Sequence, residues 1–97
     1  MKSNGDKVIG IAWYKKEQWH ILRQVVENPN DIENTYEEWL NNAINLKKTL
    51  INSGLTVEEV EIDIQDVIIW CKKDNKTINS KNITEYVVFK LMEKGTN

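Results

Sequence analysis

The side chains that could carry covalent or acid–base chemistry are few in this sequence. His20 is the single histidine and Cys71 the single cysteine of the 97 residues. A nucleophilic thiol needs an activating base and partial exposure, and a metal-binding histidine needs further ligands at a fixed spacing. His20 lies toward the polar side of one predicted helix, whereas Cys71 falls on the apolar stripe of another. We interpret them as a surface histidine and an inert core thiol, which makes an enzyme the less favoured hypothesis.

A run of acidic residues between positions 58 and 66 is the second candidate. Paired carboxylates can hold Mg²⁺ or share a proton. Glu59, Glu61 and Asp63 alternate with apolar residues, however, so they share one face of a predicted strand. The sequence also has no calcium-loop, phosphate-loop or CxxC pattern. We interpret the run as a solvated strand face followed by a helix cap, and we expect neither a metal nor a cofactor.

Four tryptophans are many for a chain of this length: Trp13, Trp19, Trp39 and Trp70. A tryptophan buries about 150–250 Å² and often keeps one polar edge in water. Two interpretations stay open. In one, each ring joins two elements of a small core. In the other, the aromatic residues form a binding site: either an interface hot spot, or a ligand pocket that Trp13, Tyr14, Trp19 and Trp39 line between the first strand and the first two helices. The core interpretation is favoured because three of the four tryptophans fall on faces assigned to the core.

The elements that must position these side chains centre on residues 35–54, the longest uninterrupted helical pattern. Thr35 with Glu38 predicts a capping box, in which the Thr35 hydroxyl accepts from the Glu38 N–H and the Glu38 carboxylate accepts from the Thr35 N–H. Gly54 predicts a left-handed C-terminal cap. We expect the rest of the chain to cover the apolar stripe between these ends. The stripe consists of Tyr36, Trp39, Leu40, Ala43, Leu46, Leu50 and Ile51.

Two strands and three further helices are predicted around this helix. The strands are expected at 8–14 and 57–63, and the helices at 15–27, at 64–71 and from 80 to about 94. Gly10 marks a bulge or a close backbone approach in the first strand. The last two helices carry more apolar surface than one stripe needs.

These elements predict a single α+β domain over residues 1–97. It is predominantly helical, in the order β-α-α-β-α-α, with a short two-stranded sheet packed on helices. Residues 1–6 are small and polar, and we expect a disordered tail there. The sequence leaves the direction of strand pairing open. Because two strands alone are marginal, they need helices on one face or pairing across a dimer at an open edge.

Composition narrows the classes of partner. The chain has 13 basic and 15 acidic residues and a net charge of −2, with Arg23 its only arginine. Phosphate binding needs clustered Lys and Arg, so we expect no nucleic-acid partner. The polar N-terminus and the lack of a long apolar run predict neither secretion nor a membrane partner, and we expect a cytoplasmic protein.

Four segments together resemble a family of small, uncharacterised bacterial proteins. They are GIAWYKKEQW (10–19), TYEEWL (35–40), IDIQDVIIWC (62–71) and NSKNITEYV (79–87). Aromatic residues carry the likeness. The resemblance implies a compact cytoplasmic bacterial domain and brings no activity, substrate or catalytic residue with it.

Three functional hypotheses follow. The first is a non-enzymatic accessory or protein-interaction domain, with a homodimer as one form, because of the excess apolar surface on the last two helices. The second is a small-ligand binding module that uses Trp13, Tyr14, Trp19 and Trp39. The third is an enzyme that uses His20, Cys71 or the acidic strand.

Overall fold

The computed structural model describes residues 8–94, so the tail expected at 1–6 lies outside the described residues. The predicted α+β class and the order β-α-α-β-α-α are confirmed. No helix among the described residues is long and apolar enough to cross a membrane. The elements are β1 (Val8–Trp13), α1 (Lys16–Val25), the short 3₁₀ helix η2 (Pro29–Asp31), α2 (Tyr36–Asn52), β2 (Thr56–Glu61), α3 (Ile64–Lys73) and α4 (Ser80–Lys94).

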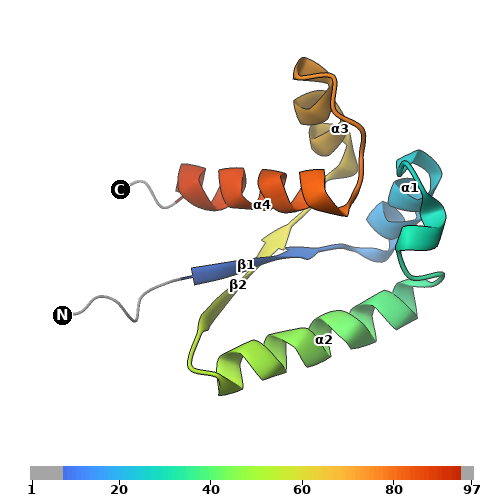
Figure 1. Ribbon diagram of the computed structural model, residues 1–97. Coiled ribbons are helices and arrows are strands. Elements are labelled where there is room, and N and C mark those ends of the chain that lie inside the picture. The colour runs from blue at the N-terminus through green and yellow to red at the C-terminus, as the bar shows by residue number, and fades with distance from the viewer. Residues whose placement is uncertain (1–7, 95–97) are drawn as a thin grey trace.

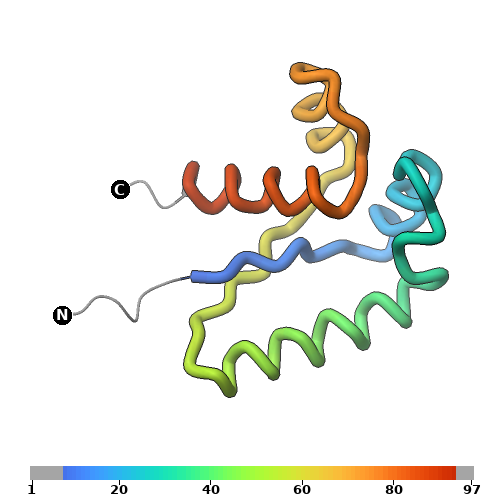
Figure 2. The backbone as a smooth tube through the Cα atoms, in the orientation of Figure 1, coloured from blue at the N-terminus to red at the C-terminus, as the bar shows by residue number. Residues whose placement is uncertain are grey.

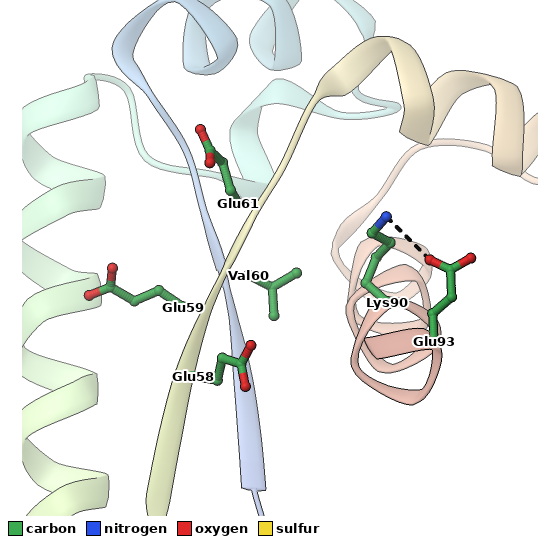
Figure 3. Close-up of a pocket in the computed structure, with 6 residues that line it drawn as sticks. All are labelled: Glu58, Glu59, Val60, Glu61, Lys90 and Glu93. Atoms are coloured by element: carbon green, nitrogen blue, oxygen red, sulfur yellow. Dashed lines mark ion pairs between the residues drawn. The ribbon is translucent and has the colours of Figure 1, made fainter. Parts of the chain in front are cut away.

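The two strands pair in parallel, with Val8 opposite Thr56 and Trp13 opposite Glu61. This is possible because α1 and α2 return the chain to the end of the sheet at which β1 began. α2 and α4 lie on opposite sides of the sheet (Figure 1). Figure 3 shows the same division at β2, where Glu59 points toward α2 and Val60 toward α4. Helices therefore cover both faces of the sheet, and its two outer edges have no strand beside them within residues 8–94.

Gly10 is the close backbone approach that the sequence predicts. A Cβ atom built on it would lie 2.6 Å from Leu91 Cδ1 and 2.7 Å from Val87 Cγ1. Leu91 and Val87 both belong to α4, so the lack of a side chain at Gly10 lets this helix pack directly on β1.

The N-terminus of α2 forms as predicted, with one exception. Thr35 Oγ1 accepts a hydrogen bond from the Glu38 N–H at 3.1 Å. The Glu38 carboxylate, however, accepts from the Asn34 N–H at 3.2 Å, and not from Thr35 as predicted. The chain enters the helix extended at Thr35, which leaves the preceding N–H within reach of the carboxylate.

The C-terminus of α2 is the predicted glycine cap. Gly54 has a φ of 93°. The Gly54 N–H donates to Ile51 O at 2.9 Å, and the Leu55 N–H donates to Leu50 O at 3.1 Å. These two bonds define a Schellman motif, which satisfies carbonyls that the helix itself leaves without partners.

The expectation that the rest of the chain covers the whole apolar stripe of α2 is wrong. Trp39 and Ala43 are buried, but Leu46 and Ile51 are each 49% exposed. Two strands about 4.8 Å apart form a sheet narrower than a helix about 10–12 Å across, so α2 overhangs the sheet on both sides. The most deeply buried side chains lie instead on α1, on α3 and just after β2: Trp19, Leu22, Ile62, Ile64, Val67 and Cys71.

Several predicted boundaries shift by one or two residues. The first strand ends one residue early, at Trp13, and the first helix ends at Val25 because Val26 is already extended. The second strand runs from Thr56 to Glu61, since Asp63 leaves it to cap α3. In two of these cases the reason is local: the extended backbone at Val26 ends α1, and the use of Asp63 as a helix cap ends β2 early.

The caps of the last two helices agree with the sequence. Asp63 Oδ1 accepts from the Gln65 N–H at 2.9 Å, and Asn75 after α3 has a φ of 57°. Of the two residues predicted to cap the last helix, it is Asn79 whose Oδ1 accepts from the Asn82 N–H, at 2.9 Å. The start of α3 is also held by the Gln18 side chain of α1, which accepts from the Ile64 N–H at 2.7 Å.

Candidate functional site

The four aromatic residues predicted to act together do lie together. Trp39 stands at the centre: its ring centroid is 5.4 Å from that of Trp13, 5.1 Å from that of Tyr14 and 5.6 Å from that of Trp19. Trp19, Trp39 and Tyr14 are buried, at 1%, 8% and 5% exposure, whereas Trp13 is half-buried. The rings therefore fill much of the interior between β1, α1 and α2.

A hollow of about 380 Å³ borders this cluster on one side. Three of the four predicted residues line it, namely Tyr14, Trp19 and Trp39. The sequence reasoning missed the rest of its wall, which comes from β1, α1, α2, α4 and the turn at η2. The additional residues are Ile11, Ala12, Leu22, Asp31, Ile32, Glu33, Leu46, Ser80, Ile83 and Thr84. Only the tertiary fold brings the turn of α4 at Ser80 next to β1, so no local pattern could have indicated it.

Trp13 borders a second, smaller hollow of about 290 Å³. Tyr14, Lys15, Glu59 and Glu61 form the rest of its lining. Lys15 Nζ lies 3.0 Å from Glu61 Oε2, so these two charges neutralise one another at the rim. The structure thus divides the predicted aromatic set between two neighbouring hollows.

The indole N–H of Trp19 is an unusual feature of the larger hollow. Trp19 Nε1 is the one buried side-chain polar atom of the described residues that has no hydrogen-bond partner. Leaving a buried donor unsatisfied costs about 1–3 kcal/mol. Trp19 is among the residues that line the larger hollow, but its Nε1 atom is itself buried, so an acceptor in the hollow would reach this donor only if neighbouring side chains moved.

Charge at the rim of the larger hollow comes from the turn between α1 and α2. The buried position of the Tyr14 phenol raises its pKa well above the ordinary value, and the nearby Glu33 carboxylate raises the pKa further. Arg23 Nη1 donates to Glu33 O at 2.7 Å and to Pro29 O at 3.3 Å, which holds the turn in place. The Glu33 carboxylate accepts from Asn42 Nδ2 at 2.9 Å.

The acidic strand face is exposed, as predicted. Glu59, Glu61 and Asp63 are all exposed, and Glu59 Oε2 pairs with Lys47 Nζ of α2 at 2.7 Å. A hollow of about 420 Å³ follows the outer edge of β2, where Lys90 and Glu93 of α4 face the strand and pair with one another (Figure 3). Within residues 8–94, no group of three His, Cys, Asp or Glu side chains is placed to hold a metal ion.

The two single-copy candidates lie in different environments. His20 is exposed on α1. Cys71 is 1% exposed on α3, and burial raises the pKa of its thiol, which disfavours the reactive thiolate.

The chain matches no protein-family model, no curated protein and no solved structure. The resemblance to a family of small bacterial proteins therefore stays a prediction.

Proposed function

We propose that this protein is a non-enzymatic protein-interaction domain, with self-association as one form of that interaction. The observation that carries the proposal is its exposed apolar surface. Eight large apolar side chains are 37–65% exposed: Val8, Ile44, Leu46, Ile51, Ile69, Val88, Phe89 and Met92. Single exposed apolar residues are ordinary, but neighbouring ones are typical of interaction surfaces.

Half of these side chains belong to the last two helices. Ile69 lies on α3, and Val88, Phe89 and Met92 lie on α4. Phe89 also packs on Trp70, with ring centroids 5.9 Å apart, so this exposed ring belongs to an aromatic contact between the two helices. We refer to the exposed residues Ile69, Phe89 and Met92 together as the α3–α4 surface. Its presence supports the hypothesis that the excess apolar surface on these helices serves binding.

Affinity capture from bacterial extract, followed by mass spectrometry, tests this function. Wild type is compared with the double variant Phe89→Lys/Met92→Lys, and with Gln24→Lys, which adds charge at an exposed polar site of α1. We expect proteins captured by wild type and by Gln24→Lys to be lost with the double variant. An unchanged set of captured proteins would remove the α3–α4 surface as the binding site.

The larger aromatic hollow favours a second candidate function, the binding of a small ligand. Its volume lies at the lower end of the range of about 300–1,000 Å³ for ligand sites, and one of the residues that line it is Trp19, whose buried N–H has no hydrogen-bond partner among the described residues. A ligand with an apolar body and one hydrogen-bond acceptor would fit this chemistry. Tryptophan fluorescence across a metabolite panel tests it. We expect a response in wild type that Trp19→Phe weakens, and no response to any compound would reject this candidate.

A further inference from the structure

The outer edge of β1 has no strand beside it among residues 8–94, so the backbone groups along this edge make no ladder hydrogen bonds within the described part of the chain. β1 pairs only with β2 among the described residues. In Figures 1 and 2, β1 runs in front of β2, between α4 and α2. No further described strand lies along the edge of β1 that faces away from β2. Such an edge is a ready template for pairing with another strand.

The direction of the backbone groups can be assigned from one hydrogen bond. The Ile62 N–H donates to Trp13 O at 3.0 Å, so the polar backbone groups of Trp13 point toward β2. Those groups alternate in direction along a strand of a parallel pair. The N–H and C=O groups of Val8, Gly10 and Ala12 therefore point to the outer edge, where Ala12 borders the larger hollow.

The two outer edges of the sheet differ in charge. β2 has the sequence TVEEVE, and an antiparallel copy of it would place glutamates against glutamates. β1 has the sequence VIGIAW and carries no charge or proline, the residues with which proteins usually protect an edge. The charge pattern therefore permits β1 to pair with a second copy of itself and opposes such pairing at β2.

Apolar side chains flank the β1 edge on both sides. Leu46 of α2 lines the hollow there and is 49% exposed. Thr84 of α4 lines it from the other side, and Val88, one helical turn further on, is also 49% exposed. Val8, at the start of the strand, is 43% exposed. A strand added at this edge would bring its own flanking helices against these side chains.

We propose that β1 pairs in antiparallel fashion with β1 of a second copy of this chain, giving a four-stranded sheet in the order β2-β1-β1-β2. The inference deepens the interaction function proposed above and depends on it. The two-fold axis runs perpendicular to the sheet, because neighbouring antiparallel strands of identical sequence are related in this way. The axis keeps each face on its own side, so α2 lies beside α2 and α4 beside α4. Leu46 and Val88 then lie at the interface between the copies.

Sedimentation equilibrium of the full chain tests this interface. Leu46→Lys and Val88→Lys place a charge at the proposed contact, and we expect each to raise the dimer Kd at least about tenfold, which corresponds to about 1.4 kcal/mol. Ile51→Lys is the matched control for Leu46, since Ile51 is equally exposed on α2 but follows Lys47 on the β2 side. Gln65→Lys, which adds charge at an exposed polar site of α3 outside both proposed surfaces, is the control for Val88. Both controls are expected to keep the wild-type Kd, and circular dichroism verifies that all four variants are folded.

Amide hydrogen exchange provides a second measurement. The Gly10 and Ala12 N–H groups are expected to become protected as protein concentration rises in wild type, and to stay unprotected in Leu46→Lys. A wild type that stays monomeric up to roughly 1 mM would overturn the inference. Protection of the Gly10 and Ala12 N–H groups on addition of a small molecule, while the protein stays monomeric, would also overturn the inference. A dimer broken by the double variant Phe89→Lys/Met92→Lys, and not by Leu46→Lys or Val88→Lys, would remove this interface while leaving the interaction function in place.

Discussion

At Gly10 the absence of a side chain decides how closely α4 approaches the sheet. An added Cβ would overlap Leu91 and Val87, and overpacking of this kind costs about 1–3 kcal/mol. We expect Gly10→Ala to lower the free energy of unfolding by that amount, measured by urea denaturation. The double variant Gly10→Ala/Leu91→Ala should lose less than the two single variants added together, because Leu91→Ala makes room for the new methyl group. If the loss in the double variant equals the sum of the two single losses, the contact between residue 10 and Leu91 does not limit how closely α4 packs on β1.

Glu27 links the end of α1 to the connector before α4. Its carboxylate accepts from Thr77 Oγ1 at 3.0 Å and from Asn79 Nδ2 at 3.1 Å, and its backbone N–H donates to Ile78 O at 2.7 Å. The side-chain hydrogen bonds from Asn79 and Thr77 hold the pKa of this carboxyl below its ordinary value of 4.5. They stabilise the charged form in the folded state.

The pKa shift of Glu27 predicts part of the pH dependence of stability. Because the folded pKa is lowered, its contribution is fully present above the ordinary value and is lost as pH falls through the folded pKa. We expect Glu27→Gln to flatten the decline of melting temperature below about pH 5, the range in which such a carboxyl protonates. Asp31→Asn, at an exposed position of η2, is the control. Equal pH profiles for Glu27→Gln and wild type would contradict the prediction.

At the scale of elements, both ends of α2 are held by capping hydrogen bonds, whereas part of its apolar stripe stays exposed. Thr35 supplies the hydroxyl that accepts from the Glu38 N–H. We expect Thr35→Ala to lower the free energy of unfolding by about 1 kcal/mol, as loss of an N-cap usually does. Thr49→Ala, at an exposed site within the same helix, is expected to be neutral or slightly stabilising because alanine favours helix. Thermal unfolding followed by circular dichroism compares them, and similar losses in both would argue against a capping role.

Pairs of elements are joined by specific long-range contacts as well as by apolar packing. The Tyr36 hydroxyl donates to Tyr14 O at 3.1 Å, which ties the start of α2 to the end of β1. Gln18 of α1 ties down the start of α3 in the same way. These bonds join residues 22 and 46 positions apart, which no local pattern in the sequence reveals.

At the scale of the whole molecule, two aromatic clusters hold different parts together. Trp39 contacts Trp13, Tyr14 and Trp19 between β1, α1 and α2. Trp70 packs on Phe89 between α3 and α4, and Lys76 Nζ lies 5.1 Å from the centroid of the Trp70 ring. The described body measures 44 × 30 × 18 Å, so it is thin in one direction. A thin body has little interior, which makes each large buried ring important for stability.

This arrangement predicts unequal effects of removing the two tryptophans. Trp39→Ala is expected to lower the free energy of unfolding by about 3–5 kcal/mol, the usual cost of deleting a buried aromatic ring. Trp70→Ala is expected to cost less, because Trp70 is only half-buried. Urea denaturation followed by circular dichroism measures both without relying on tryptophan fluorescence. A larger loss for Trp70→Ala would mean that the second cluster is the main one.

The amino-acid sequence by itself determined the order of the elements and several of the caps at their ends. Hydrophobic periodicity, the Thr35 cap, the Gly54 terminator and the Asp63 cap are local signals, and each acts within a few residues. The aromatic set Trp13, Tyr14, Trp19 and Trp39 was also visible, since large apolar rings must pack together.

Only the tertiary structure decided what depends on contacts between distant residues. The parallel pairing, the exposure of Leu46 and the hollow between β1 and the start of α4 all follow from how the elements are placed in space. A sheet of two strands is too narrow to cover the helices on its faces. The width of the sheet cannot be predicted from any one segment of the sequence, because it depends on how many strands pair. Among residues 8–94, the same placement leaves no strand beside the uncharged outer edge of β1.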